Sequence, residues 1–207
     1  MYRALAPTAL GTVLVAAFAI AVPPAAQAQS QVHPQSRPMS FYTTLSGGIS
    51  NADIDCSGAA TCHRNGTAFK LIGGWNINDG LAAEVTYASL GTAKIADSGV
   101  SVDVKGSYVG LGLAGHYDID STFAALVRGG WASGSAKTTD SVAGIGSITE
   151  SRNGTNHWYF GLGGRVYLTR NWRLDFDYDR TRVSSFIAGS KSTNDVGAFM
   201  AGGSYTF

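Results

Sequence analysis

Charged residues are scarce in this chain of 207 residues, and neither sign of charge prevails. Lysine, arginine, aspartate and glutamate make up 14 % of the sequence, whereas soluble domains contain about 25 %. The formal net charge is +1, from 15 basic and 14 acidic side chains. This balance, without any long basic run, argues against a nucleic-acid partner.

After residue 40 the chain also lacks an apolar run long enough for a membrane-spanning helix. The one long run covers residues 4–22 and is followed by a small-x-small site that ends at Ala28. This pattern predicts a secretory signal peptide at 1–28, cleaved between Ala28 and Gln29. An uncleaved anchor helix is the alternative. Residues 29–40 are polar, contain two prolines and are expected to form a disordered lead-in.

Cysteine is almost absent, since the chain contains only Cys56 and Cys62. Export would carry both into an oxidising compartment, where a disulfide within one short loop is the expected outcome. A metal site formed with Asp53, Asp55 and His63 is the alternative, but its spacing matches no standard zinc pattern. The sequence therefore predicts a disulfide and no metal or other cofactor.

Alternation of apolar and charged residues is clearest in residues 171–180, which read NWRLDFDYDR. A strand places successive side chains on opposite faces, so one face here is apolar and the other charged. Segments of about ten residues, the length of a strand that crosses a bilayer, recur eight times. They cover residues 41–49, 67–75, 81–90, 105–117, 122–133, 157–168, 172–181 and 195–207.

The connections between these segments alternate strictly between short and long. The short ones, at 76–80, 118–121 and 169–171, carry turn-forming residues. The long ones are rich in glycine and small polar residues, and they cover 50–66, 91–104, 134–156 and 182–194. An up-and-down sheet would gather the short turns at one end and the long loops at the other, as in bacterial outer-membrane barrels. The few apolar side chains of the loops are interpreted as packing over the barrel mouth: Ile145, Ile148, Phe186 and Ile187.

The non-aromatic face of the strands consists of small residues with a few charges of balanced sign. Water outside a soluble sandwich would favour many long charged side chains there, so this face is predicted to line a narrow interior. An eight-stranded barrel has room inside only for side chains. We therefore predict an all-β fold, an eight-stranded antiparallel up-and-down transmembrane β-barrel at 41–207, with aromatic bands facing lipid. Its interior would hold an ion-paired network of Lys70, Glu84, Arg128, Arg165, Arg173, Asp175, Asp177 and Asp179.

Two sequence blocks resemble the small OmpA-like outer-membrane β-barrel family. They are GLGGRVYLTRNWRLDFDYDR at 161–180 and MAGGSYTF at 200–207, and the resemblance extends over about 40–207. Tyr205 and the final Phe207 resemble the signal that the barrel-assembly machinery reads. The resemblance implies a protein of the outer membrane with both termini in the periplasm. Lipid and lipopolysaccharide of that membrane are the implied partners. The resemblance covers the barrel alone, so a peptidoglycan-binding domain like that of two-domain members is not expected.

Function is predicted to be non-enzymatic: a monomeric barrel that is structural, or that displays its loops to a ligand or host factor. A small or gated ion channel is the alternative, because lumenal charges can select ions. A lipid-modifying enzyme is a weaker alternative, since catalysis needs a nucleophile beside a base. No serine–histidine pair is predicted to face lipid, and no catalytic residue is assigned among His33, His63, His116 and His157.

Overall fold

The computed structural model describes residues 39–54, 56, 60–97, 100–142, 146–187 and 190–207, with the backbone alone at 97, 152–155, 183–187 and 190–192. The predicted signal peptide with its cleavage site, and nearly all of the lead-in, lie outside these residues. No helix of spanning length and apolarity occurs among them. The strands are β1 (Phe41–Ala52), β2 (Thr61–His63), β3 (Asn65–Asn76), β4 (Leu81–Asp97), β5 (Val100–Asp118), β6 (Phe123–Val142), β7 (Gly146–Tyr167), β8 (Trp172–Ile187) and β9 (Ser190–Thr206).

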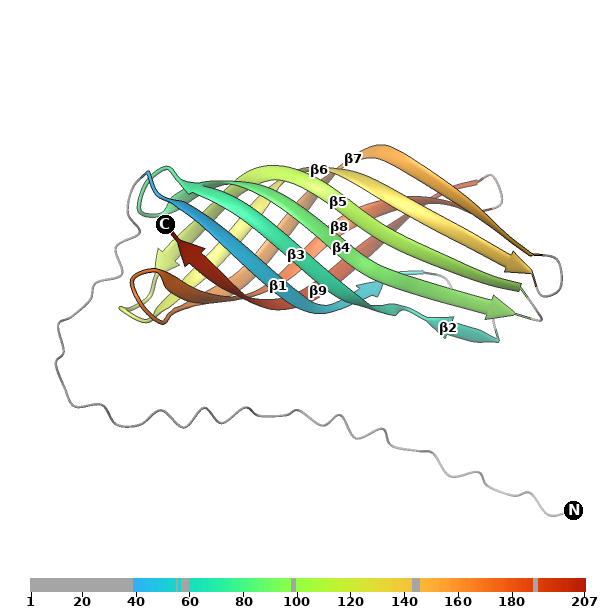
Figure 1. Ribbon diagram of the computed structural model, residues 1–207, viewed down its shortest axis with the longest axis horizontal. Coiled ribbons are helices and arrows are strands. Elements are labelled where there is room, and N and C mark those ends of the chain that lie inside the picture. The colour runs from blue at the N-terminus through green and yellow to red at the C-terminus, as the bar shows by residue number, and fades with distance from the viewer. Residues whose placement is uncertain (1–38, 55, 57–59, 98–99, 143–145, 188–189) are drawn as a thin grey trace, which may run out of the picture. The chain divides into compact units, whose positions relative to one another are not determined.

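Eight of the strands close into a ring, and β2 stands outside it. Each strand pairs antiparallel with the next along the chain, and the ring closes where β1 pairs with β9 from Tyr42↔Thr206 to Ala52↔Val196. In Figure 1 the first strand, blue, accordingly lies beside the last, dark red. Closure leaves no strand edge in the wall of the barrel, which is what a β-sheet surrounded by hydrocarbon requires. The predicted eight-stranded antiparallel barrel is confirmed.

The two faces of the wall differ as the alternation predicts. On the outward face Leu111 is 65 % exposed and Trp131 is 66 % exposed. On the inward face Lys70 and Asp175 are 0 % and 1 % exposed. This is the reverse of a soluble protein, because the charged groups are enclosed and the large apolar groups surround the barrel. The outward apolar set includes Phe41, Leu45, Ile49, Leu71, Val85, Tyr87, Val109, Leu113, Phe123, Phe160, Leu162, Phe176, Tyr178 and Phe199.

The three short turns are stabilised by side chains that accept backbone hydrogen bonds. The Asn78 side-chain Oδ1 atom accepts from Gly80 N at 2.9 Å. The Asp120 carboxylate accepts from Thr122 N and Phe123 N at 2.6 and 2.9 Å. Such short turns hold the ends of the two strands close together, so they fix the register of the strands on either side. Both ends of the barrel chain lie at this short-turn end, where Phe207 N donates to the Phe41 carbonyl oxygen at 2.9 Å.

The long loops are the part of the predicted fold that needs correction. Most of the residues expected to be loop at 91–104, 134–156 and 182–194 are strand, because β4 to β9 continue beyond the barrel wall as hairpins; the longest of these strands, β7, has 22 residues in all. Outside a membrane both faces of a hairpin meet water, so no alternation marks it as a strand. Ile148 is 73 % exposed and does not pack over the barrel mouth. Ile145 and the side chains of Phe186 and Ile187 lie outside the described residues.

A bulge in β4 marks the transition from the wall to one of these extensions. The register between β4 and β5 shifts between Ser89 and Thr92, and Gly91 adopts a φ of +75°. A Cβ atom at Gly91 would lie 2.6 Å from the Thr67 carbonyl oxygen, so glycine is required on both counts. Beyond this bulge β4 no longer pairs with β3. It pairs with the short strand β2 instead, from Thr61↔Ala96 to His63↔Lys94.

Candidate functional site in the barrel interior

The middle of the barrel interior holds a cluster of charges that connects opposite parts of the wall. Lys70 on β3 forms ion pairs with Asp177 and Asp179 on β8, and its Nζ lies 2.7 Å from the Asp179 carboxylate. Two strands, β1 and β9, separate β3 from β8 in the ring. Lys70 therefore bridges the lumen, whereas cross-strand neighbours would pair along the wall.

Arg128 on β6 enters the same cluster from the other side. Its Nη1 atom lies 3.8 Å from the Glu84 carboxylate and 3.9 Å from the Asp177 carboxylate. These distances exceed a direct hydrogen bond, and no guanidinium nitrogen of Arg128 has a hydrogen-bond partner among the described residues. Arg128 is 2 % exposed. Its interaction with the carboxylates is therefore purely electrostatic, in surroundings that screen it little.

A second group of charges lies nearer the short turns. Arg165 on β7 faces Asp175 on β8, and its Nε and Nη2 atoms donate to the two carboxylate oxygens at 2.7 and 3.1 Å. Arg173 donates from Nε to the Ser204 hydroxyl at 3.0 Å, and its guanidinium lies 4.2 Å from the centre of the Tyr42 ring. Arg173 thus interacts with a π face, where an ion pair was predicted.

Tyr42 links the two groups. Its hydroxyl donates to the Glu84 carboxylate at 2.6 Å. The ring of Tyr42 lies against Gly74, where a Cβ atom would collide with it. All eight charged residues predicted for the lumen are buried, and the four cations match the four carboxylates in number. The interior has therefore no net charge from these groups to attract ions of one sign.

An apolar layer lies beside the charges and was missed from the sequence. Tyr108 and Tyr159 project inward with ring centroids 5.7 Å apart, and Leu90, Val196 and Met200 pack in the same buried cluster. The sequence predicts aromatic bands that face lipid, and no aromatic layer inside the barrel. The signal that could have found this layer is the inward parity of Tyr159 and Met200, which both alternate with lipid-facing aromatic residues. Charges and apolar groups together fill the lumen.

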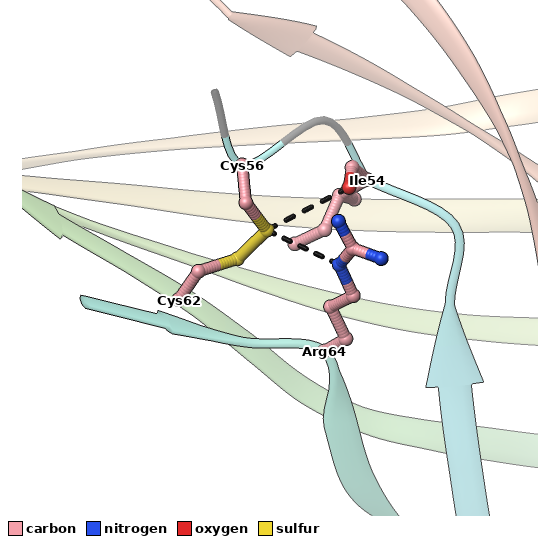
Figure 2. Close-up of a disulfide and its surroundings, with 4 residues drawn as sticks. All are labelled: Ile54, Cys56, Cys62 and Arg64. Carbon is pink, nitrogen blue, oxygen red and sulfur yellow. Dashed lines mark hydrogen bonds between the residues drawn. A yellow bond between two sulfur atoms is a disulfide. The ribbon is translucent and has the colours of Figure 1, made fainter. Parts of the chain in front are cut away.

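The disulfide lies outside the barrel wall, between the end of β1 and β2. Cys56 and Cys62 are joined with a Cα–Cα distance of 6.0 Å, within the usual range. Arg64 Nε donates to Cys56 Sγ at 3.2 Å, as Figure 2 shows. Cys62 also pairs with Ile95 on β4. The disulfide thereby ties the segment after β1 to the extension of β4.

The described histidines do not converge on one site. His116 on β5 pairs with Leu126 of β6, whereas His157 on β7 pairs with Ala132 of the same strand. Six positions of β6 therefore separate the two histidines along the wall. General acid–base catalysis by these two histidines as a pair would require their side chains to lie within hydrogen-bond distance of each other.

The comparison with protein families agrees with this architecture. A family model described as "Outer membrane protein beta-barrel domain" matches residues 12–207. The chain belongs to this family. Membership places this outer-membrane barrel in the cell outer membrane. No curated protein matches the chain.

Solved structures of other outer-membrane barrels share the fold. Neisserial surface protein A is 18 % identical, with a TM-score of 0.61 over 81 % of this chain and 97 % of that one. Ail of Yersinia pestis, crystallised with the heparin analogue sucrose octasulfate, is 20 % identical, with a TM-score of 0.51 over 82 % and 100 %. OprG from Pseudomonas aeruginosa is 16 % identical, with a TM-score of 0.52 over 82 % and 97 %. At these identities the likeness concerns the fold alone.

The C-terminal aromatic residues of this outer-membrane barrel lie on its outward face at the short-turn end. The Tyr205 ring packs edge-on against Trp172 at 5.0 Å and against Phe207 at 5.1 Å. Phe207 is 67 % exposed. Of the two residues expected to act as an assembly signal, Phe207 is therefore exposed on the outside of the barrel, whereas Tyr205 is half-buried between Trp172 and Phe207.

Proposed function

We propose that this outer-membrane barrel is a non-enzymatic, non-conducting surface protein that stabilises the membrane and displays its strand extensions and loops outside the cell. The observation that carries the proposal is the filled lumen. Four buried cations, four buried carboxylates and the Tyr108–Tyr159 layer leave no open path in an interior that is only wide enough for side chains. The small or gated channel is the alternative.

Planar-bilayer recording separates these two functions. The purified full chain should give no steady conductance. Arg128→Ala removes a large side chain from the middle of the lumen, and we expect brief, small openings from this variant. Phe176→Leu changes only the lipid face and serves as the control. A large steady conductance of the unaltered protein would show that it is a pore.

The proposal also assigns an orientation, with the short turns and both chain termini in the periplasm and the extensions outside. Outer-membrane barrels commonly have short periplasmic turns and long external loops. The test is a peptide tag inserted either after Val142, at the outer end of the β6–β7 hairpin, or after Ile119, in a short turn. Antibody should label intact cells only for the tag after Val142. Labelling for the tag after Ile119 would reverse the assignment.

The proposed partners follow from this orientation. The barrel-assembly machinery would act from the periplasm on the end that carries Tyr205 and Phe207. A ligand or host factor would meet the opposite end, around 50–66, 91–104, 134–156 and 182–194. A monomer is expected, because the closed ring leaves no strand edge in the wall for another copy.

A further inference from the structure

Two lysines lie directly opposite each other on neighbouring strands outside the barrel wall. Lys105 on β5 and Lys137 on β6 are partners in the antiparallel ladder, and both side chains are exposed. Side chains in this relation have Cβ atoms about 5 Å apart, and like charges placed so destabilise the sheet. The pair therefore favours a counter-charge between or beside the two ammonium groups.

The protein itself supplies little of that counter-charge. Asp103 is the near carboxylate on the same face, and it is engaged with Lys94 at 3.3 Å. Among the described residues, neither Lys105 nor Lys137 forms an ion pair. Asp140 pairs with Val102, so it lies on the opposite face of the sheet. The three lysines and one aspartate of this face leave an excess of two positive charges.

The height of the pair on the barrel places it above the hydrocarbon. Lys137 follows Trp131, an outward aromatic residue that pairs with Leu111, by six positions. At about 3.3 Å per residue and a strand tilt of about 40°, this separation is roughly 15 Å along the membrane normal. The outward residues between them include Ser133 and Ser135, which are polar. In the orientation proposed above, this height corresponds to the layer of lipid head groups and their sugars.

We propose that Lys105 and Lys137 form a binding site for a phosphate group of an outer-leaflet glycolipid. A phosphate carries up to two negative charges, and two ammonium groups on one face supply donors to its oxygens from neighbouring strands. The flanking hydroxyl residues Thr92 and Ser151, which pair with Lys105 and Lys137, add further donors. The inference deepens the proposed function, because it rests on the outward position of the extensions.

The test compares thermal unfolding in three lipid environments, with gel mobility of the full chain as the readout. The environments are vesicles containing lipopolysaccharide, vesicles containing the same lipopolysaccharide after enzymatic dephosphorylation, and vesicles of phosphatidylcholine alone. The variants are Lys137→Gln and the double variant Lys105→Gln/Lys137→Gln. Lys137→Arg keeps the charge, and Arg170→Gln removes an exposed cation at the other end of the barrel.

The expected signature is a change of sign. In phosphatidylcholine, removing the charge of Lys137 relieves its repulsion with Lys105, so the midpoint temperature of unfolding should stay unchanged or rise. With lipopolysaccharide it should fall, and apparent glycolipid affinity should drop about fivefold per lysine. Lys137→Arg and Arg170→Gln should behave like the unaltered protein. Dephosphorylation should abolish this fall, so that the double variant behaves as it does in phosphatidylcholine.

Two outcomes would overturn the site. Equal shifts of the double variant in all three environments would mean that the lysines act only on the fold. Equal stabilisation by intact and dephosphorylated glycolipid would show that sugars or acyl chains, rather than phosphate, are bound. The tag-labelling and conductance measurements address orientation and pore formation independently, so a failure there is distinguishable from a failure here.

Discussion

Asp177 is the lumenal residue whose neutralisation we expect to be most damaging. Asp177→Asn preserves the shape of the side chain and removes its charge. Asp177 forms an ion pair with Lys70 and lies 3.9 Å from Arg128, and all three side chains are at most 1 % exposed. The variant therefore weakens the neutralisation of two buried cations at once.

The magnitude follows from what each cation retains. Removing one partner of a fully buried ion pair costs about 3–5 kcal/mol. Lys70 keeps Asp179 at 2.7 Å, and Arg128 keeps Glu84 at 3.8 Å. We therefore expect the lower end of that range, about 3 kcal/mol of unfolding free energy. Asp179→Asn should cost less, because Lys70 is the only described cation within ion-pair distance of Asp179.

The assay is reversible urea unfolding in lipid vesicles, followed by tryptophan fluorescence and checked by gel mobility. A second substitution, Lys70→Met, removes the cation that Asp177→Asn leaves under-compensated. The double variant should therefore be more stable than the sum of the two single changes predicts, by about 1 kcal/mol or more. If the free energy of unfolding of Asp177→Asn lies within about 0.5 kcal/mol of that of the unaltered protein, the network does not stabilise the barrel as described.

Three further perturbations have defined outcomes. Phe176→Asp places a carboxylate at mid-strand on the lipid face, where charge is costly, and should block insertion into the outer membrane, whereas Phe176→Leu should insert normally; equal insertion of both would contradict the assignment of faces. Gly74→Val would collide with the Tyr42 ring and should destabilise the barrel by about 1–3 kcal/mol in urea unfolding, while unchanged stability would mean that the ring moves freely. Outside the membrane, hydrogen bonds from the Arg180 and Arg182 side chains lower the pKa of Asp195. The stabilisation from these bonds is therefore present above about pH 4, the unfolded pKa, and is lost as pH falls through the lower folded pKa. Amide exchange at the outer end of β8 and β9 should accelerate over that pH range, and exchange rates that show no such pH dependence would refute a stabilising role of these bonds.

The faces of the barrel were predictable because one physical rule applies at every position of the wall. Phe176 and Asp177 alternate, and only an enclosed polar interior within hydrocarbon accommodates both. The partners inside were less predictable. The register that places Arg165 opposite Asp175 follows from the tight turn at 169–171, whereas the approach of Lys70 to Asp177 depends on the curvature of the whole ring. Sequence spacing contains no information about that distance.

The extensions were mistaken for loops for a related reason. Lys105 and Lys137 occupy regular strand positions, yet both faces of their hairpins meet water and either face tolerates polar residues. Strand formation there depends on backbone hydrogen bonds between neighbouring strands, which produce no alternation of apolar and polar residues in the sequence. The lumenal apolar layer was not predicted because, in the sequence, the inward Tyr159 resembles one more member of the aromatic bands.

The pairing of Lys70 with β8 has a consequence for biogenesis. The two partners are separated by 107 residues, so their contact forms late, after nearly the whole chain has been delivered. Until then a nascent sheet would present a bare ammonium and several carboxylates to any hydrocarbon it entered, at a high energetic penalty. Insertion into the membrane is thereby coupled to closure of the barrel. An incomplete sheet is favoured in water, where chaperones can still bind it.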